Sequence, residues 1–416
     1  MARGTRERRD ATHERAADAE DMNVHRILSL GSSRPDRIIL RGANARCSPT
    51  GRHMQEPALL ADPRELADRV AGWPASAVLA LDTEFMRERT FHPLLCLVQL
   101  AVAGKILLVD PLAIPGLPAL AAPLVDPGRV KILHAARQDL EALLPVTGQP
   151  LAAVFDTQIA AGLLGFPAQI GYGELVRRLL GIELHKGHTR TDWTRRPLSR
   201  EQLIYAAEDV AHLPALAELL DERLAAAGRR GWLDEEAAAL TDPALYRADP
   251  EQAWRRLRGL ERLDPQGRAV ARTLAGWREE RALARNLPRG WILADAALLE
   301  LARLRPQTRV ALAELEALPR GTIERQGDAL LAAIAAAAIR EDDLDSNGAG
   351  RPDAAQQQQL KVLQQRLAGI ATELDIAPEV LATRRELAAI VRGTHDLPVL
   401  AGWRRSVVGE ALLAAL

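Results

Sequence analysis

The sequence predicts an α/β domain, built on a mixed sheet with helices on its faces, followed by one or two all-helical domains. Between residues 75 and 200, short β-rich apolar runs alternate with helical segments, which is typical of such a sheet. From about residue 200 onward no strand pattern remains. A length of 416 residues suggests about three domains.

The first elements are predicted as follows. Residues 1–53 lack any sustained apolar period, so we expect a disordered extension. The pattern becomes regular after Met54, and residues 55–73 predict a helix that leads into a strand. Translation from Met54 and a real but flexible tail are both open interpretations.

The α/β domain is expected over residues 54–228. Strands are predicted at 77–85, 95–103 and 105–109, the last two joined by a hairpin turn at Gly104, and at 130–133 and 153–155, each followed by a helix. Residues 199–227 predict one long helix with Ser199 as its N-cap. A meander followed by βα units predicts a mixed sheet.

The helical part is divided by composition. Residues 228–250 connect the α/β domain to a helical segment over 249–339. An acidic stretch that contains glycine and ends in glutamines, residues 341–359, predicts a linker. Residues 360–416 are helical again, and we expect a second, divergent copy of the first helical domain.

Composition excludes several classes of protein. A hydrophobic fraction of 48% with 26% charged residues supports globular cores. The longest apolar run has eleven residues, far fewer than the roughly 20 that cross a bilayer, and the N-terminus lacks a secretory apolar region. Two cysteines allow no disulfide framework. We therefore expect a cytoplasmic protein.

Carboxylates in three places form candidate functional groups. Asp82 and Glu84 lie two apart at the end of an apolar strand and leave the same face. Asp139 falls near the start of a helix, and Tyr205 and Asp209 share a helix face because they are four apart. Taken alone, each pattern also fits a structural explanation: a solvated strand end, a helix cap and an amphipathic helix.

Together these patterns resemble the DEDD family of 3'-to-5' exonucleases, in the subgroup with Tyr in the third motif and, within it, ribonuclease D. The first motif is Asp82-Thr83-Glu84-Phe85, the second ends at Asp139, and the third runs from Tyr205 to Asp209. Intervening strings also match, including Cys96 to Leu100, Phe155 to Gln158 and Lys186 to Trp193. The resemblance covers residues 62–226 and implies a ribonuclease H-like fold.

The resemblance implies an enzyme that hydrolyses RNA from its 3' end. Asp82, Glu84, Asp139 and Asp209 would hold two divalent metal ions, and oxygen ligands favour Mg²⁺ or Mn²⁺. Tyr205 would hydrogen-bond the attacking water. The expected partner is RNA with a free 3' end, in particular tRNA precursors, bound by a monomer with no nucleotide cofactor and no membrane association. Candidate substrate-binding residues are Phe85, Gln99, His134, Lys186, Arg190, Arg278 and Arg281.

Residues 249–339 resemble the HRDC domain, a small helical nucleic-acid-binding module. Trp277-Arg278, Asn286-Leu287-Pro288 and Arg305-Pro306 carry this resemblance. Residues 360–416 lack the Asn-x-Pro and Arg-Pro signals. A helicase is excluded because the sequence has no phosphate-binding loop motif. A DNA exonuclease and a non-catalytic RNA-binding adaptor stay open as alternatives, although all four acids and Tyr205 are intact.

Overall fold

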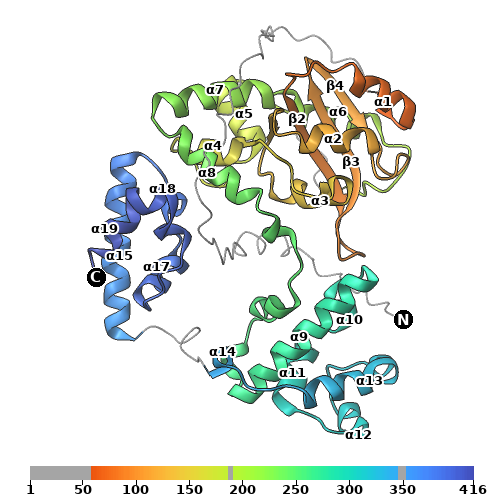
Figure 1. The fold of residues 1–416 in the computed structure, drawn as a ribbon, viewed down its shortest axis with the longest axis vertical. Helices are drawn as coiled ribbons and strands as arrows, with labels where there is room; N and C mark the ends of the chain where they lie inside the picture. The colour runs from red at the N-terminus through yellow and green to blue at the C-terminus, as the bar shows by residue number, and fades with distance from the viewer. Residues whose placement is uncertain (1–57, 186–190, 345–352) are drawn as a thin grey trace, which may run out of the picture.

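A computed structural model describes residues 58–185, 191–344 and 353–416 (Figure 1). The predicted extension over 1–53 lies outside the described residues. Six strands form one mixed sheet in the order β1-β4-β3-β2-β5-β6. Their bounds are β1 Leu59–Leu60, β2 Leu79–Met86, β3 Leu94–Val102, β4 Lys105–Val109, β5 Lys131–Leu133 and β6 Val154–Asp156.

The centre of the sheet is the antiparallel meander of β2, β3 and β4. A tight turn joins β3 to β4, where Ala103 and Gly104 both have positive φ, as the predicted hairpin requires. The strands β5 and β6 continue the sheet in parallel with β2. The register between β2 and β3 shifts between Glu84 and Phe85, so that Cys96 is left without a partner on β2. This irregularity lies at the end of β2 that carries the predicted carboxylates.

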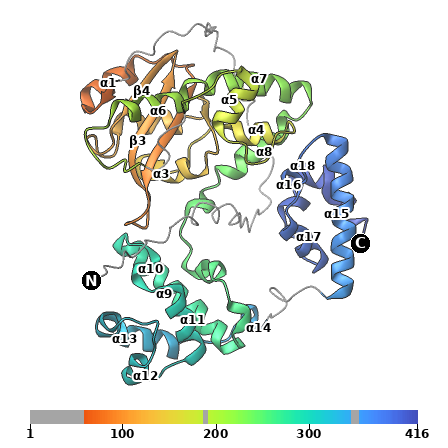
Figure 2. The same cartoon turned by 180° about the vertical axis from the view of Figure 1, so that it is seen from behind.

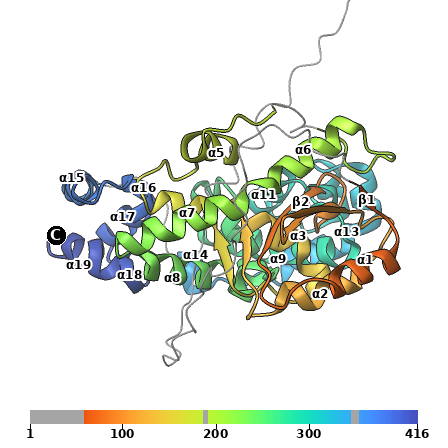
Figure 3. The ribbon, with the colours of Figure 1, turned by 90° about the horizontal axis from the view of Figure 1, so that it is seen from above.

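Helices cover both faces of the sheet (Figure 3). One face packs against α1 Pro63–Ala71, α2 Pro118–Val125 and α3 Arg137–Thr147. The other packs against α4 Thr157–Gly162, α5 Tyr172–Leu180, α6 Arg200–Ala211 and α7 Leu213–Ala226. Because β2 is buried between two layers, polar groups on it need partners.

The first predicted helix is confirmed and the last is wrong in detail. In the described part of residues 55–73, α1 begins at Pro63 with Asp62 as its N-cap, and the short strand β1 before it pairs with β4. The helix predicted over 199–227 is interrupted at His212. Pro214 explains the interruption, because it has no N–H to donate to the carbonyl four residues earlier and its ring crowds that carbonyl.

The first helical domain is built around one long helix. Its elements are η3 Pro250–Arg256, η4 Leu260–Arg262, α9 Pro265–Arg285, α10 Arg289–Ile292, α11 Asp295–Leu304, α12 Arg309–Ala313, α13 Arg320–Ala335 and α14 Glu341–Leu344. The predicted linker over 341–359 begins too early, because Asp343 is buried against α9 in a salt bridge with Arg272, 2.7 Å long. The linker also ends earlier than predicted, since a helix starts at Ala354, and residues 345–352 between them lie outside the described residues.

The C-terminal helices pack on the α/β domain. They comprise α15 Ala354–Leu374, α16 Pro378–Leu381, α17 Arg384–Val391, η6 Pro398–Leu400, α18 Gly402–Arg404, η7 Arg405–Gly409 and α19 Glu410–Leu413. Trp403 stacks on Trp232 of α8 (Arg230–Leu240) with ring centroids 4.4 Å apart. Gly165 lies so close to Asp375 that a Cβ would come within 2.3 Å of its carbonyl oxygen. The two parts therefore share one hydrophobic core.

The first helical domain contacts the loop between β2 and β3 (Figure 2). The backbone N–H groups of Phe91 and His92 donate to Oδ1 of Asn286, at 3.1 and 3.0 Å. The guanidinium of Arg289 lies over the Phe91 ring, 4.5 Å from its centroid. No helix of the described ranges is long and apolar enough to cross a membrane.

Candidate active site

The end of β2 presents carboxylates on one face and a hydroxyl on the other. Asp82 and Glu84 are half-buried, while Thr83 between them is buried, which is the alternation that a strand imposes. The Thr83 hydroxyl donates a hydrogen bond of 2.5 Å to Oδ1 of Asp139. The strand that carries two of the predicted acids therefore also holds the third.

Asp139 lies in the first turn of α3 and is only 6% exposed. The turn that leads into α3 is fixed by Asp156, whose carboxylate accepts from the backbone N–H groups of Ala135 and Ala136 at 3.1 and 2.8 Å. The same carboxylate caps α4. Ala135 has a φ of 57°, in the left-handed region, so this turn needs such support.

The third group comes from α6. A capping box at Ser199 and Gln202 starts this helix as predicted. Tyr205 and Asp209 share a face, and the Tyr205 hydroxyl hydrogen-bonds the Asp209 carboxylate. The buried Trp193 packs beside the Tyr205 ring, with centroids 6.3 Å apart. Asp209 thus fixes the hydroxyl of Tyr205, and Trp193 packs against its ring.

The pKa directions show that these acids lie within electrostatic range of one another. Burial raises the pKa of Asp82 well above its usual range, and the charges of Asp139, Asp209 and Glu84 raise it further. Burial also raises the pKa of Asp139 and of Asp209, each to about 7. The site is therefore an electronegative cluster in which full ionisation is costly.

The donor chemistry fits a hard divalent cation. All four groups are carboxylates, which suit Mg²⁺ or Mn²⁺, and a cation would relieve their mutual repulsion. Within the described residues, however, no three Asp, Glu, His or Cys side chains already form a ligand cluster.

Two predicted substrate contacts are wrong. Gln99 lies opposite Asp82 on β3, but it is 0% exposed beneath the helical layer. Arg278 is 4% exposed, and its guanidinium donates to the carbonyl of Leu293 and to Asp295. In both cases burial prevents direct contact with a substrate. Arg278 has a structural role in its own domain, whereas the buried amide of Gln99 has no hydrogen-bond partner among the described residues.

The remaining predicted contacts vary in accessibility. His134 uses both ring nitrogens within the protein, with Nε2 2.9 Å from the carbonyl of Ile170 and Nδ1 2.9 Å from the Thr157 hydroxyl. Phe85 is half-buried after the register shift, and Arg281 lies over Trp277 at 4.6 Å. The two predicted cations Lys186 and Arg190 lie outside the described residues.

The segment over residues 171–200 carries seven basic and three acidic side chains, a net charge of +4. Four of its arginines form ion pairs: Arg177 and Arg178 with Glu174, Arg195 with Asp192, and Arg196 with Asp110. Arg196 also donates to the carbonyl of Cys96 at 2.7 Å, which fastens the loop to β3. Only one acid from outside the segment, Asp110, takes part in these pairs, so the segment keeps a net positive charge, and Arg196 is the one whose structural role is clear.

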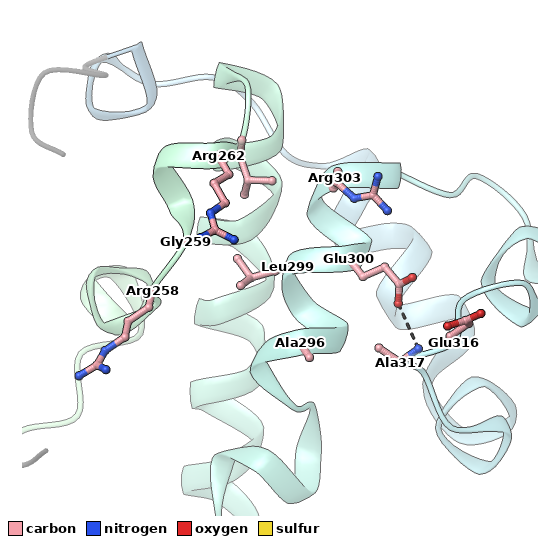
Figure 4. A pocket seen from close by; sticks show the side chains of 10 residues that line it. Arg258, Gly259, Arg262, Ala296, Leu299, Glu300, Arg303, Glu316 and Ala317 are labelled. Atoms are coloured by element: carbon pink, nitrogen blue, oxygen red, sulfur yellow. Dashed lines mark hydrogen bonds between the residues drawn. The ribbon is translucent and has the colours of Figure 1, made fainter. Parts of the chain in front are cut away.

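A hollow of about 430 Å³ lies in the first helical domain (Figure 4). Arg258, Arg262 and Arg303 line it together with two acidic side chains, Glu300 and Glu316, and Leu263 and Leu299 are among its apolar lining residues. These arginines are exposed. Sequence patterns gave no reason to select them from the other arginines of this domain.

Sequence reasoning also missed residues that hold the acids. Thr83 and Asp156 are the clearest, and Trp193 supports Tyr205. Asp156 and Trp193 belong to strings that matched the exonuclease family, but nothing in those strings showed which side chain each would contact.

Comparison with known proteins identifies the family. The 3'-5' exonuclease family matches residues 59–225, and the HRDC domain matches residues 267–334. Ribonuclease D of Gluconacetobacter diazotrophicus is 42% identical over 379 residues, which cover 89% of this chain and 95% of that protein. Ribonuclease D of Pseudomonas paraeruginosa is 39% identical over 365 residues, with coverages of 85% and 96%.

A solved structure agrees with these sequence matches. The crystal structure of Escherichia coli RNase D, described as an exoribonuclease involved in structured RNA processing, superposes with a TM-score of 0.77 at 30% identity. The match covers 87% of this chain and 99% of that structure. The mixed sheet, the order of the acids and the near-complete coverage agree, and the chain belongs to the ribonuclease D family of 3'-5' exoribonucleases.

Proposed function

We propose that this chain matures tRNA precursors from their 3' ends, with Asp82, Glu84, Asp139 and Asp209 as the ligands of two divalent cations, Mg²⁺ or Mn²⁺. One observation carries the assignment of the site: burial and the charges of nearby carboxylates raise the pKa of three of these acids together. Such a cluster is costly without a cation, and perturbed carboxylates concentrate at functional sites.

The residues of the proposed site have different roles in catalysis. Bound cations would supply the charge that stabilises the developing phosphorane and would lower the pKa of a bound water. Tyr205 orients that water through its hydroxyl, which also bonds Asp209. Burial, together with the charges of Asp209 and Glu84, raises the pKa of Tyr205, so it remains protonated: its one proton is donated to Asp209, and its oxygen accepts a hydrogen bond from the water.

RNA binding would extend beyond the catalytic site. The exposed arginines Arg258, Arg262 and Arg303 offer guanidinium groups to phosphates in a hollow that Glu300 and Glu316 also line, so they exceed its acidic side chains by one. The proposal takes the active form to be a monomer. A cytoplasmic location belongs to the same proposal, because that is where precursors of tRNA are found in bacteria.

The test is a degradation assay with a 5'-labelled tRNA precursor that carries extra 3' nucleotides. We expect shortening from the 3' end in Mg²⁺ or Mn²⁺, which stops near the mature end and is abolished by EDTA. A DNA strand of the same sequence serves as the competitor substrate. Faster degradation of DNA would favour a DNA exonuclease, and metal-independent RNA binding without shortening would favour an adaptor.

The matched variant is Asp82→Asn, which keeps the size of the side chain and removes the charge. We expect loss of turnover while the melting temperature holds or rises, because a crowded carboxylate is removed. Activity within tenfold of the parent would contradict the metal-ligand assignment.

A further inference from the structure

The junction of α6 and α7 contains an inserted side chain. In an uninterrupted helix the carbonyl of Glu208 would accept from the N–H of His212, four residues later. Here the Tyr172 hydroxyl donates to the Glu208 carbonyl at 3.0 Å and accepts from the His212 N–H at 3.2 Å. The hydroxyl therefore takes the place of one helical hydrogen bond, directly beside Asp209.

The same tyrosine contacts the element that leads to Asp139. Its ring meets the His134 ring edge to face, with centroids 5.8 Å apart. His134 begins the turn into α3 and is fixed by its own hydrogen bonds to Thr157 and Ile170. One side chain, projecting from the first residue of α5, thus touches both segments that carry Asp139 and Asp209.

Pro214 breaks the helix at this junction, because it has no N–H to donate to the carbonyl of Val210, four residues earlier. The Glu208 carbonyl and the His212 N–H lie before this break, and the Tyr172 hydroxyl bridges them. Loss of the hydroxyl would therefore remove one fixed link at the end of α6, three residues after Asp209. Burial raises the pKa of Tyr172, so its hydroxyl keeps the proton that it donates.

We propose that Tyr172 is a positioning residue of the catalytic site, which fixes Asp209 relative to Asp139 by completing the hydrogen bonding of the α6–α7 junction. This inference rests on the proposed metal-ligand role of Asp209. It assigns to Tyr172 a part in forming the cation site, with no contact to RNA.

The first test is Tyr172→Phe in the full chain, which keeps the ring and removes the hydroxyl. We expect the Mn²⁺ concentration at half-saturation to rise roughly tenfold, the low end for residues that support metal ligands. It should be measured by electron paramagnetic resonance of free Mn²⁺ without RNA, and independently from the metal dependence of kcat. The KM for RNA at saturating metal should stay within twofold.

Tyr246→Phe is the matched control. The Tyr246 hydroxyl also donates to a helix-end carbonyl, that of Leu240, at 2.6 Å. Its loss should leave Mn²⁺ half-saturation unchanged even if the melting temperature falls. A Tyr172→Phe variant that loses stability but binds Mn²⁺ as the parent does would overturn the proposal and leave Tyr172 with a purely structural role.

A double-mutant cycle separates this inference from the proposed function. If Tyr172 acts through Asp209, adding Tyr172→Phe to Asp209→Asn should change Mn²⁺ half-saturation by less than twofold, and a further tenfold loss would refute the inference. If Asp209→Asn alone leaves Mn²⁺ binding unchanged, the proposed metal site itself fails. Amide exchange of His212 in the parent chain is a second measurement, expected to be slow; fast exchange would remove the structural premise.

Discussion

Replacing Asp139 with asparagine removes one buried carboxylate. The amide oxygen of the asparagine can still accept the hydrogen bond from the Thr83 hydroxyl. The pKa of Asp139 is about 7 in the folded chain, against 3.8 for an ordinary aspartate. Between these values the folded state holds a proton that the unfolded chain has lost. Without metal, this group therefore makes the protein less stable as pH rises from about 4 to about 7, and the loss is complete above about 7.

The size of the effect follows from the difference between the two pKa values. Each pH unit corresponds to 1.36 kcal/mol, so ionising Asp139 in the fold costs about 4 kcal/mol at pH 8. Asp82 and Asp209 share part of this cost, because they are ionising in the same cluster. We expect Asp139→Asn to raise metal-free stability at pH 8 by about 2 to 4 kcal/mol, or about 5 to 10 °C for a domain of this size.

The assay is thermal unfolding in EDTA at pH 5.5, 6.5, 7.5 and 8.5, for parent and variant side by side. The difference between the two curves reports the titration of Asp139 together with its effect on Asp82 and Asp209, because the charge of Asp139 raises the pKa of both. The melting temperature of the variant should rise relative to that of the parent as pH rises. Mg²⁺ at pH 8 should raise the melting temperature of the parent more than that of the variant. A difference that does not change with pH would refute the reasoning.

Three further outcomes are expected. Tyr205→Phe should lower kcat by roughly 100-fold while metal-induced stabilisation stays unchanged; equal activity would mean that the ring serves packing alone. Asp156→Ala should destabilise the fold by about 3 kcal/mol in denaturant titration, because the N–H groups at the start of α3 and α4 lose their acceptor; a loss below about 0.5 kcal/mol would contradict this role. Deleting residues 353–416 should cause aggregation in light scattering, since Trp232 and Leu233 lose their cover; a monomer with the parent's melting temperature would show that the core is not shared.

The local features of the site were predictable because they depend on short spacings. Asp82 and Glu84 share a strand face, and Tyr205 and Asp209 share a helix face, as periods of two and of 3.6 residues require. The hairpin at Gly104 and the cap at Ser199 follow from local turn and capping chemistry. The break at His212 was missed although Pro214 signals it, because the apolar pattern continues across it.

Two of the residues predicted to contact RNA, Arg278 and Gln99, are buried in the structure. Arg278 was selected because arginines recur on one helix, yet its position faces the core and its partner Asp295 lies on another element. Gln99 matched a family string, but a strand covered by α6 buries it. Spacing along a chain does not reveal which face another element will cover.

The sequence by itself determined the family, the order of the acids and the period that aligns each pair, since these depend on residues close together in the chain. Only the tertiary structure decided what holds the acids: Thr83 reaches Asp139 across 56 positions, and Tyr172 reaches the end of α6 across 36. It also placed Trp403 on Trp232, which joins the last helices to the catalytic domain. Such contacts depend on how separate elements pack, and packing is set by the complementary shapes of many side chains together, which no local period encodes.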